Sequence, residues 1–403
     1  MKKGWQTKTL GEVLEKTETV NPLQSPKTEF DYIDVSSVSN TTFQIEETQR
    51  LKGKDAPSRA RKVVRTNDII FATIRPTLQR IAVVPEHLDK QVCSTGYFVL
   101  RPKPGIDHRF VFYSLFTENF IGQMESLQKG ASYPAVTDGD VRAQEIPVPP
   151  LAEQQRIVGL LDEAFEGLAT AKANAEKNLQ NARALFERHL QSVFTQRGPG
   201  WVENKLKSIT TKIGSGATPR GGGESYKDEG ISLIRSLNVH DLGFKYAKLA
   251  FLDDAQADEL SNVEVQPLDV LLNITGASVA RCAIVPEDVL PARVNQHVSI
   301  IRLIAEKLDA DFLHYLLISK PYKDQLLKTG EEGGSTRQAI TKAQIQEFTV
   351  EYPVTLKEQK TIVAKLDAVL AETQRLARLY ERKHAALEAL KKSLLHQAFT
   401  GEL

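Results

Sequence analysis

The sequence predicts a mixed α/β (α+β) protein with two similar globular domains, each followed by one long helix. Three observations support this fold class. A stretch that begins at Leu151 occurs again 205 residues later without a gap. Apolar residues in both copies follow a heptad period. Strand-like runs recur in the same order ahead of each copy, so the chain reads as a duplicated unit. At 403 residues it is also long enough for more than one hydrophobic core.

The repeated stretch covers residues 151–195 and 356–400. The identical positions include Leu151 with Leu356, Glu153 with Glu358, Gln154 with Gln359, Ile157 with Ile362, Leu161 with Leu366, Asp162 with Asp367 and Phe194 with Phe399. The first copy has no Pro and only two Gly, so each copy predicts a continuous helix, about 66 Å long for about 44 residues. Equal length without gaps indicates that helix length matters.

Alternating steps of four and three residues pick out one seam on each helix. The first seam is Leu161, Phe165, Leu168, Lys172, Ala175, Leu179, Ala182, Phe186, His189 and Val193. The second is Leu366, Leu370, Thr373, Ala377, Tyr380, His384, Leu387, Lys391, Leu394 and Ala398. A single narrow apolar stripe is not stable alone in water. Each helix therefore needs a partner, and the other copy is the nearest candidate.

Composition describes an ordinary globular protein, with 41% hydrophobic and 26% charged residues and a formal charge of +1. This charge excludes a histone-like protein but not local basic surfaces. Cys93 and Cys282 occupy different places in the two halves, so we expect buried free thiols rather than a disulfide or metal set. The start of the chain lacks the apolar segment of a signal peptide, and no apolar run reaches the ~18 residues of a membrane span. A cytoplasmic location is expected.

The two globular domains show matching elements. In the first domain we predict strands at residues 68–74, 80–84, 96–101 and 145–148, and a helix at 108–127 capped by Asp107. In the second we predict strands at 269–273, 281–285 and 297–303 and a helix at 312–327. The predicted organisation is domain 1 at residues 1–150, helix 1 at 151–197, domain 2 at 198–352 and helix 2 at 353–403.

No complete catalytic motif is visible. The glycine-rich residues 214–223 match neither the phosphate loop GxxxxGK[ST] nor GxGxxG, and they predict a mobile loop. Residues 21–24, Asn-Pro-Leu-Gln, fail at two positions the Asn/Asp-Pro-Pro-Tyr/Phe motif of amino-methyltransferases. The eight His show no paired metal spacing, and His189 and His384 on the helix seams are expected to be core or interface residues. We predict that the chain is not an enzyme and holds no metal or cofactor.

Basic residues gather between residues 50 and 65. The segment has seven cations against Asp55 alone, a local charge of +6. Because Gly, Pro and Ser interrupt it, we expect a loop that presents charge, either to solvent or to phosphates. The candidate phosphate contacts are Arg50, Lys52, Lys54, Arg59, Arg61, Lys62 and Arg65. Further candidates for contact with base edges or phosphates are the loop residues Arg75, Ser132, Tyr133, Arg220, Arg235, Ser335, Thr336 and Arg337.

Residues 146–158, IPVPPLAEQQRIV, and 394–403, LLHQAFTGEL, resemble the start and the end of the long helices in DNA specificity (S) subunits of type I restriction–modification systems. Residues 294–298, VNQHV, and 216–219, GATP, are similar to stretches in the recognition domains of that family. The resemblance covers the whole chain in the order target-recognition domain, spacer helix, target-recognition domain, spacer helix.

This resemblance implies an expected function. Each globular domain reads one half of a split, asymmetric site on double-stranded DNA, and the helices pair antiparallel as a ruler. The expected partners are two methylation subunits and motor/endonuclease subunits, which would bind S-adenosylmethionine, ATP and Mg²⁺.

Two alternatives come from other functional classes. A stand-alone fused methyltransferase/endonuclease would need the motifs that are missing here. A two-domain structural adaptor without a DNA role would show no salt-dependent binding to random duplex.

Overall fold

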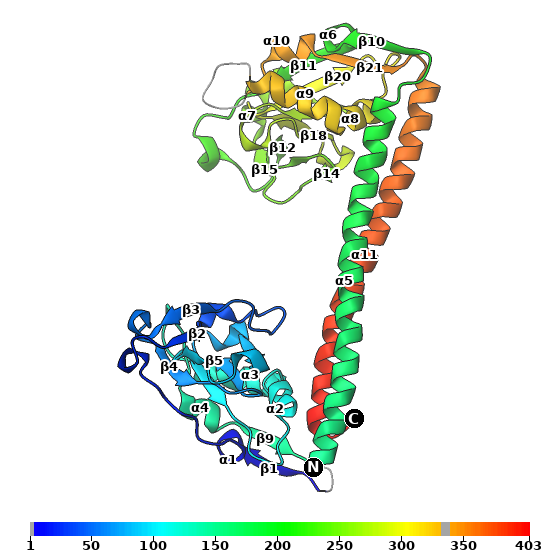
Figure 1. The fold of residues 1–403 in the computed structure, drawn as a ribbon. Coiled ribbons are helices and arrows are strands. Elements are labelled where there is room, and N and C mark those ends of the chain that lie inside the picture. Colours follow the sequence, from blue (N-terminus) through cyan, green and yellow to red (C-terminus); the bar gives the residue numbers. More distant parts are fainter. Residues whose placement is uncertain (1–3, 332–338) are drawn as a thin grey trace. The chain divides into compact units, whose positions relative to one another are not determined.

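The computed structural model describes residues 4–331 and 339–403, and it confirms the mixed α/β fold with two long helices (Figure 1). The internal contacts divide the chain into two compact units. Unit 1 comprises Met1–Glu176 and Glu381–Leu403, and unit 2 comprises Lys177–Tyr380. Each unit therefore contains one globular domain together with parts of both long helices.

The globular domain of unit 1 is built on a four-stranded sheet and a three-stranded sheet. In spatial order these are β3 (Gln49–Lys52), β2 (Glu29–Ile33), β7 (Val92–Ser94) and β4 (Ala60–Val63), and β6 (Ile81–Val83), β5 (Ile69–Ala72) and β8 (Tyr97–Leu100). A further pair, β1 (Gln6–Thr9) and β9 (Glu145–Val148), joins the start of the domain to its end. The predicted strands are present as β5, β6, β8 and β9, whereas the four-stranded sheet was not predicted.

Helices cover one face of the three-stranded sheet. They are α1 (Leu10–Val13), α2 (His108–Ser114), α3 (Glu118–Leu127) and α4 (Asp138–Arg142). The single helix predicted at residues 108–127 is wrong, because Thr117 is extended and its hydroxyl caps α3. A Thr side chain that accepts a backbone N–H starts a new helix instead of continuing the old one. Asp107 caps α2 as predicted.

Unit 2 repeats this plan. Its sheets are β11 (Thr210–Ser215), β20 (Val298–Leu303), β17 (Val270–Asn273) and β18 (Cys282–Ile284), and β15 (Ala250–Leu252), β12 (Ile231–Ile234), β19 (Ala292–Val294) and β16 (Glu264–Val265). Two strand pairs add β10 (Trp201–Lys205) with β21 (Thr349–Pro353), and β13 (Val239–His240) with β14 (Gly243–Phe244). The helices are α6 (Leu206–Ile209), α7 (Asp254–Glu259), α8 (Ala310–Ile318), α9 (Lys320–Glu331) and α10 (Lys342–Glu347).

Two further predictions for unit 2 need correction. The single helix at 312–327 is divided into α8 and α9, because Ser319 is extended between them and Pro321 follows at the start of α9. The glycine-rich stretch was predicted as a mobile loop, but Gly214 and Ser215 belong to β11. Cys93 and Cys282 are buried free thiols as predicted.

The long helices α5 (Leu151–Thr195) and α11 (Leu356–Thr400) cover the two repeated stretches and have 45 residues each, and the predicted helix segments 151–197 and 353–403 extend beyond them by two or three residues. Every predicted seam position on both helices is at least half-buried. In unit 1 the first turns of α5 pack with the last turns of α11 through Ile157, Leu161, Leu395 and Ala398. In unit 2 the last turns of α5 pack with the first turns of α11. The pairing is therefore antiparallel in each unit.

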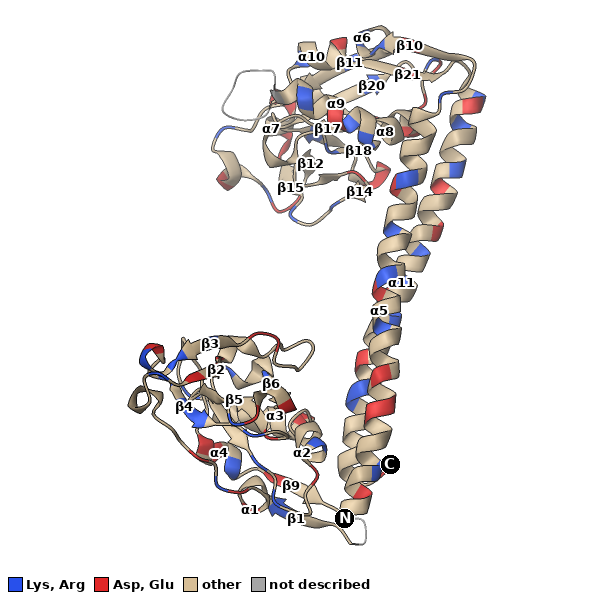
Figure 2. Ribbon diagram, viewed as in Figure 1, with Lys and Arg blue, Asp and Glu red and all other residues tan. Residues whose placement is uncertain are grey.

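Two polar contacts give the register of this pairing. Lys172 Nζ lies 2.7 Å from Glu388, and His384 Nε2 lies 3.4 Å from Glu176. The polar seam residues thus face partners across the pair. Charges of both signs alternate along α5 and α11 (Figure 2), as expected for a solvated pair of helices.

A buried glutamine connects each globular domain to the helix that follows it. Gln154, which is 1% exposed, accepts the N–H of Asp107 at 2.8 Å and donates to Pro149 O at 2.8 Å. Gln359, which is fully buried, accepts the N–H of Asp309 at 2.7 Å and donates to Pro353 O at 2.8 Å. Because Asp107 and Asp309 cap α2 and α8, each glutamine fixes a helix of the domain against the long helix.

Unit 1 has an additional contact between its domain and the helices. Phe43 adopts a left-handed conformation with φ of 56°, and its ring packs edge-on against Phe116 at 4.7 Å. The ammonium group of Lys391 on α11 lies 5.0 Å from the centre of the Phe43 ring and 5.4 Å from that of Phe165 on α5. Burial lowers the pKa of Lys391. Cation–π attraction compensates part of the cost of burying this ammonium.

Candidate nucleic-acid interface

Four connecting segments of the first domain come together at the ends of its strands. They are residues 34–38, 73–80, 94–96 and 129–135, here called loop cluster 1. Arg80 Nη1 donates to the carbonyl of Val38 at 2.6 Å, and the Thr73 hydroxyl donates to Gly96 O at 3.1 Å. Ile74 forms a β-bridge with Ala135. Backbone and side-chain bonds thus hold four segments together that are far apart in the sequence.

Three of the predicted contact residues meet in loop cluster 1. Arg75 is left-handed, with φ of 51°, and its N–H donates to Pro134 O at 2.7 Å. Its guanidinium lies 5.3 Å from the ring centre of Tyr133, and Nη2 is 3.5 Å from Ser132 O. Tyr133 is 73% exposed. A left-handed non-Gly residue costs roughly 1–3 kcal/mol, and such strain gathers at functional sites.

Three of these connections have counterparts in the second domain, at residues 235–238, 274–281 and 295–297, and with residues 215–220 they form loop cluster 2. Asn273 Nδ2 donates to Ser236 O at 2.9 Å, and the Ile274 N–H donates to His297 O at 3.0 Å. The Gly216 N–H donates to Asn295 O at 3.2 Å. Gly276, with φ of 73°, follows its strand as Arg75 does in the first domain. The two clusters share a backbone plan but carry different side chains.

The predicted residues of the second domain are spread out. Arg220 is exposed on the loop that follows β11. Arg235 is half-buried, lies 5.1 Å from the ring centre of Tyr226, and donates to Lys248 O at 2.5 Å. Ser335, Thr336 and Arg337 lie outside the described residues. Contact of any of these residues with DNA stays a prediction.

The basic run at residues 50–65 is not the loop that was predicted. It forms β3, a short 3-10 turn and β4, and these strands are the two opposite edges of the four-stranded sheet. Arg50 faces acidic residues of β2, at 3.0 Å from Asp31 and 3.5 Å from Glu29. Lys62 Nζ donates to Tyr97 O and to Asp138, both at 2.7 Å. Carboxylates from β2 and from α4 therefore neutralise part of the charge counted along the sequence.

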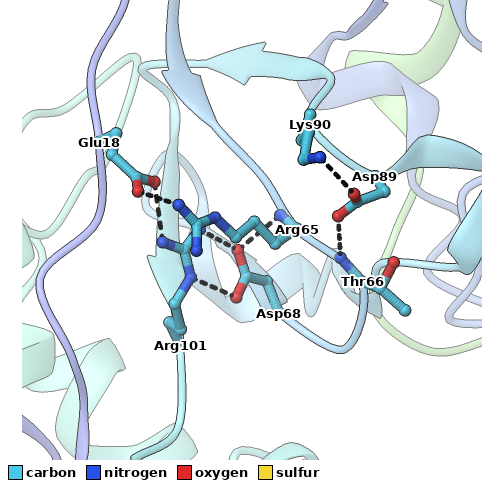
Figure 3. A network of polar contacts seen from close by, with 7 residues as sticks. All are labelled: Glu18, Arg65, Thr66, Asp68, Asp89, Lys90 and Arg101. Atoms are coloured by element: carbon cyan, nitrogen blue, oxygen red, sulfur yellow. Dashed lines mark hydrogen bonds and ion pairs between the residues drawn. The ribbon is translucent and has the colours of Figure 1, made fainter.

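Arg65 lies at the exposed end of an ion network whose buried members are Asp68 and Arg101 (Figure 3). Its guanidinium pairs with Glu18, and its backbone N–H donates to Asp68 at 2.8 Å. Arg101 forms a bidentate pair with Asp68 at 2.9 and 2.8 Å and also reaches Glu18 at 2.8 Å. Hydrogen bonds to both carboxylates raise the pKa of Arg101. Arg302 and Asp269 form the same bidentate pair in unit 2, which indicates a structural role.

Three of the seven cations have side chains without a hydrogen bond or ion pair within residues 4–331 and 339–403: Lys52, Lys54 and Arg59. Arg61 donates to Ala60 O at 2.8 Å. These three are exposed and are the remaining candidates for phosphate contact in this part of the domain. Their interaction with phosphates would be sequence-independent.

Two further observations concern metal-binding groups and membrane-spanning helices. In the part of the chain that the structure describes, no three His, Cys, Asp or Glu side chains gather as a metal-binding group. Among the same residues, no helix has the length and apolar character needed to cross a membrane.

Sequence reasoning missed several residues that the fold brings together. Arg80 ties three carbonyls of loop cluster 1. Thr218, Gln296, His297 and Thr275 form a hydrogen-bonded chain in loop cluster 2. The only sequence signal for the latter set is that Thr218, Gln296 and His297 fall within the stretches 216–219 and 294–298 singled out above.

Comparisons with known proteins agree with this duplicated architecture. Residues 2–179 and 199–381 match the family model described as the type I restriction modification DNA specificity domain. The chain is 24% identical over 334 residues to the type I restriction enzyme MjaVIII specificity subunit of Methanocaldococcus jannaschii, covering 78% of this chain and 75% of that protein. It is 24% identical over 339 residues to the EcoKI specificity subunit of Escherichia coli K12, covering 77% and 69%.

Two solved structures are similar over the full chain. The crystal structure of the HsdS subunit from Thermoanaerobacter tengcongensis is 31% identical with a TM-score of 0.70, covering 100% of this chain and 98% of that one. A chain from a structural study of assembly and conformational transition in the type I R-M system is 31% identical with a TM-score of 0.82, covering 100% and 99%.

Proposed function

Because the chain belongs to the type I restriction–modification DNA specificity family, we propose that its two globular domains read the two halves of one split DNA site. Recognition of a DNA target is the role that family membership supports. The observation that carries the proposal is the duplication of the loop clusters. The two clusters share three connections but differ in side chains, with Arg75 and Tyr133 in one and Gln296 and His297 in the other. Different side chains on one frame should read different bases.

We further propose that α5 and α11 set the number of unread base pairs between the half-sites. Equal helix lengths of 45 residues and the polar contacts of Lys172 and His384 across the pair support this role. Two helices can set a distance only if their register is fixed. Contacts between side chains at corresponding positions along the two helices fix it.

The catalytic steps are proposed to belong to other subunits. The chain would bind two methylation subunits and, through them or directly, motor/endonuclease subunits. S-adenosylmethionine, ATP and Mg²⁺ would then bind to those partners. Consistent with this division, the sequence carries no methyltransferase or nucleotide-binding motif.

The test is an exchange of residues 1–150 for the matching domain of a relative, followed by sequencing of the methylated motif produced by the assembled complex. One half-site should change while the other half-site and the gap stay the same. A hybrid that alters both half-sites would show that the domains share one reading surface. An adaptor without a DNA role would show no salt-dependent binding to duplex DNA.

A further inference from the structure

Four polar side chains from three segments form a continuous hydrogen-bonded chain in loop cluster 2. Thr218 Oγ1 lies 2.5 Å from Gln296 Oε1, and Gln296 Nε2 lies 3.2 Å from His297 Nε2. His297 Nδ1 lies 2.5 Å from Thr275 Oγ1. Gln296 is exposed, and the other three are half-buried. The most exposed member of this chain is therefore the Gln296 amide.

The backbone around the chain is closely constrained. A Cβ on Gly216 would lie 1.8 Å from Val294 O, so only glycine allows this close approach. The approach brings Thr218 to Gln296. Asn295, which is 4% exposed, accepts the N–H of His297 at 3.0 Å. This bond holds the turn that carries the Gln296 amide and the His297 ring. The positions of Gln296 and His297 are thus set before any ligand binds.

The chemistry of the donors fixes the direction of each bond. An amide oxygen only accepts, so the Thr218 hydroxyl donates to Gln296 Oε1. An amide nitrogen only donates, so Gln296 Nε2 donates to His297 Nε2. The His297 proton then resides on Nδ1 and is donated to Thr275 Oγ1. Within residues 4–331 and 339–403, these bonds leave Gln296 with one N–H and one Oε1 lone pair unused.

This free pair matches one base edge. In the major groove adenine offers the N7 acceptor and the N6 amino donor, and glutamine binds both at once. Guanine offers two acceptors there, so its O6 would face the amide oxygen. We propose that Gln296 reads an adenine in the half-site bound by the second domain, with Thr218 and His297 as positioning residues. This inference rests on the proposed function.

The first domain has no such group at the equivalent place. Ala72 pairs with Tyr97 at the end of β5, and Asn273 pairs with Val298 at the end of β17. Counting back from these pairs, Thr95 and Gly96 stand where Gln296 and His297 stand. Neither residue can present an amide. The inferred contact therefore concerns one position in one half-site.

The experiment sequences the methylated motif made by full-length variants assembled with their methylation subunits. In Gln296→Ala one A·T position of the second half-site should become degenerate, with discrimination lowered roughly 5- to 150-fold. Gln296→Glu should shift that position toward cytosine, because a carboxylate accepts from the cytosine N4 amino group. Gln266→Glu is the matched control, since Gln266 is exposed and precedes β17 at the opposite end of the strand.

Positioning by Thr218 has its own readout. Thr218→Val removes the donor and leaves the amide free to rotate, so discrimination should fall at the same base pair. Thr218→Ser keeps the hydroxyl and should restore it. If the Gln296 variants assemble poorly, the comparison of Thr218→Val with Thr218→Ser tests the inferred base contact in their place.

Four outcomes would count against the inference. Full activity of Gln296→Ala with an unchanged motif would overturn it, as would a changed base other than adenine. Equal behaviour of Thr218→Val and Thr218→Ser would remove the positioning role. A wild-type complex that binds DNA without any defined motif would instead refute the proposed function, and this inference with it.

Discussion

Replacement of Gln154 by Leu should loosen the first globular domain from α5. The variant removes the acceptor of the Asp107 N–H and the donor to Pro149 O, both at 2.8 Å, in a residue that is 1% exposed. A buried backbone group left without its partner costs about 1–3 kcal/mol, so two such groups cost roughly 2–6 kcal/mol. The apolar Leu side chain returns part of this through burial. A net loss of about 2–4 kcal/mol follows from these values.

The assay is hydrogen–deuterium exchange of the peptide that covers residues 105–111, at the start of α2. A loss of about 2–4 kcal/mol in local opening corresponds to exchange roughly 30- to 1,000-fold faster, since about 1.4 kcal/mol is tenfold. Gln155→Leu is the matched control, because Gln155 is its exposed neighbour on the same helix. Gln359→Leu should produce the same effect in residues 307–313 of unit 2, where Gln359 makes equivalent bonds.

The reasoning would be refuted if Gln154→Leu and Gln155→Leu exchanged alike at the start of α2. Local exchange is preferred to a global midpoint, because a chain with two compact units need not unfold in one step. Neither glutamine variant should change the bases that are read.

Three further predictions follow from the structure. Alanine at the three unpaired cations should lower the slope of log affinity against log salt by about 0.9 per lost phosphate contact and leave the methylated motif unchanged; the cations are Lys52, Lys54 and Arg59. Seven helix-forming residues inserted after Ala175 and after Ala385 keep the seam and add about 10 Å, so the sequenced motif should gain roughly three unread base pairs. Phe43→Ala removes the ring contact with Phe116 and the Lys391 ammonium contact, so the unfolding free energy of unit 1 should fall by about 1–3 kcal/mol in denaturant titrations.

Each of these predictions has a contradicting result. A changed motif with an unchanged salt slope would mean that the three cations read bases. An unchanged gap in a well-folded insertion variant would mean that the helices do not set the spacing. For Phe43, Leu23→Ala provides an exposed control, and equal stability of the two variants would show that the Phe43 contact is not stabilising.

The long helices could be predicted to within three residues at each end, whereas the surface charge could not. A heptad seam is a local property, and α5 and α11 end where the period ends. The charge at residues 50–65 depends on partners from elsewhere. Asp31 lies 19 residues before Arg50, on a strand that was not predicted, and Asp138 lies 76 residues after Lys62, at the start of α4.

The candidate site was predicted in the same uneven way. Arg75 and Tyr133 were identified as polar or aromatic loop residues, but their contact at 5.3 Å needs the bridge between Ile74 and Ala135. Gln296 needs three segments to meet, and the glycine that permits this is 80 residues earlier in the chain. The spacing of residues along the sequence does not show which distant segments come into contact.

The composition of unit 1 from distant segments has a consequence for biosynthesis. The Phe110 ring lies 4.8 Å from that of Phe399, and its cluster includes Leu395 and Ala398. At about 5–20 residues per second, the ribosome needs roughly 15–60 s to add the ~290 residues between these two rings. During that interval the apolar start of α5 lacks its partner helix. The nascent chain therefore exposes an apolar surface that the finished protein buries. A chaperone or early assembly with a partner subunit would have to cover this surface during synthesis.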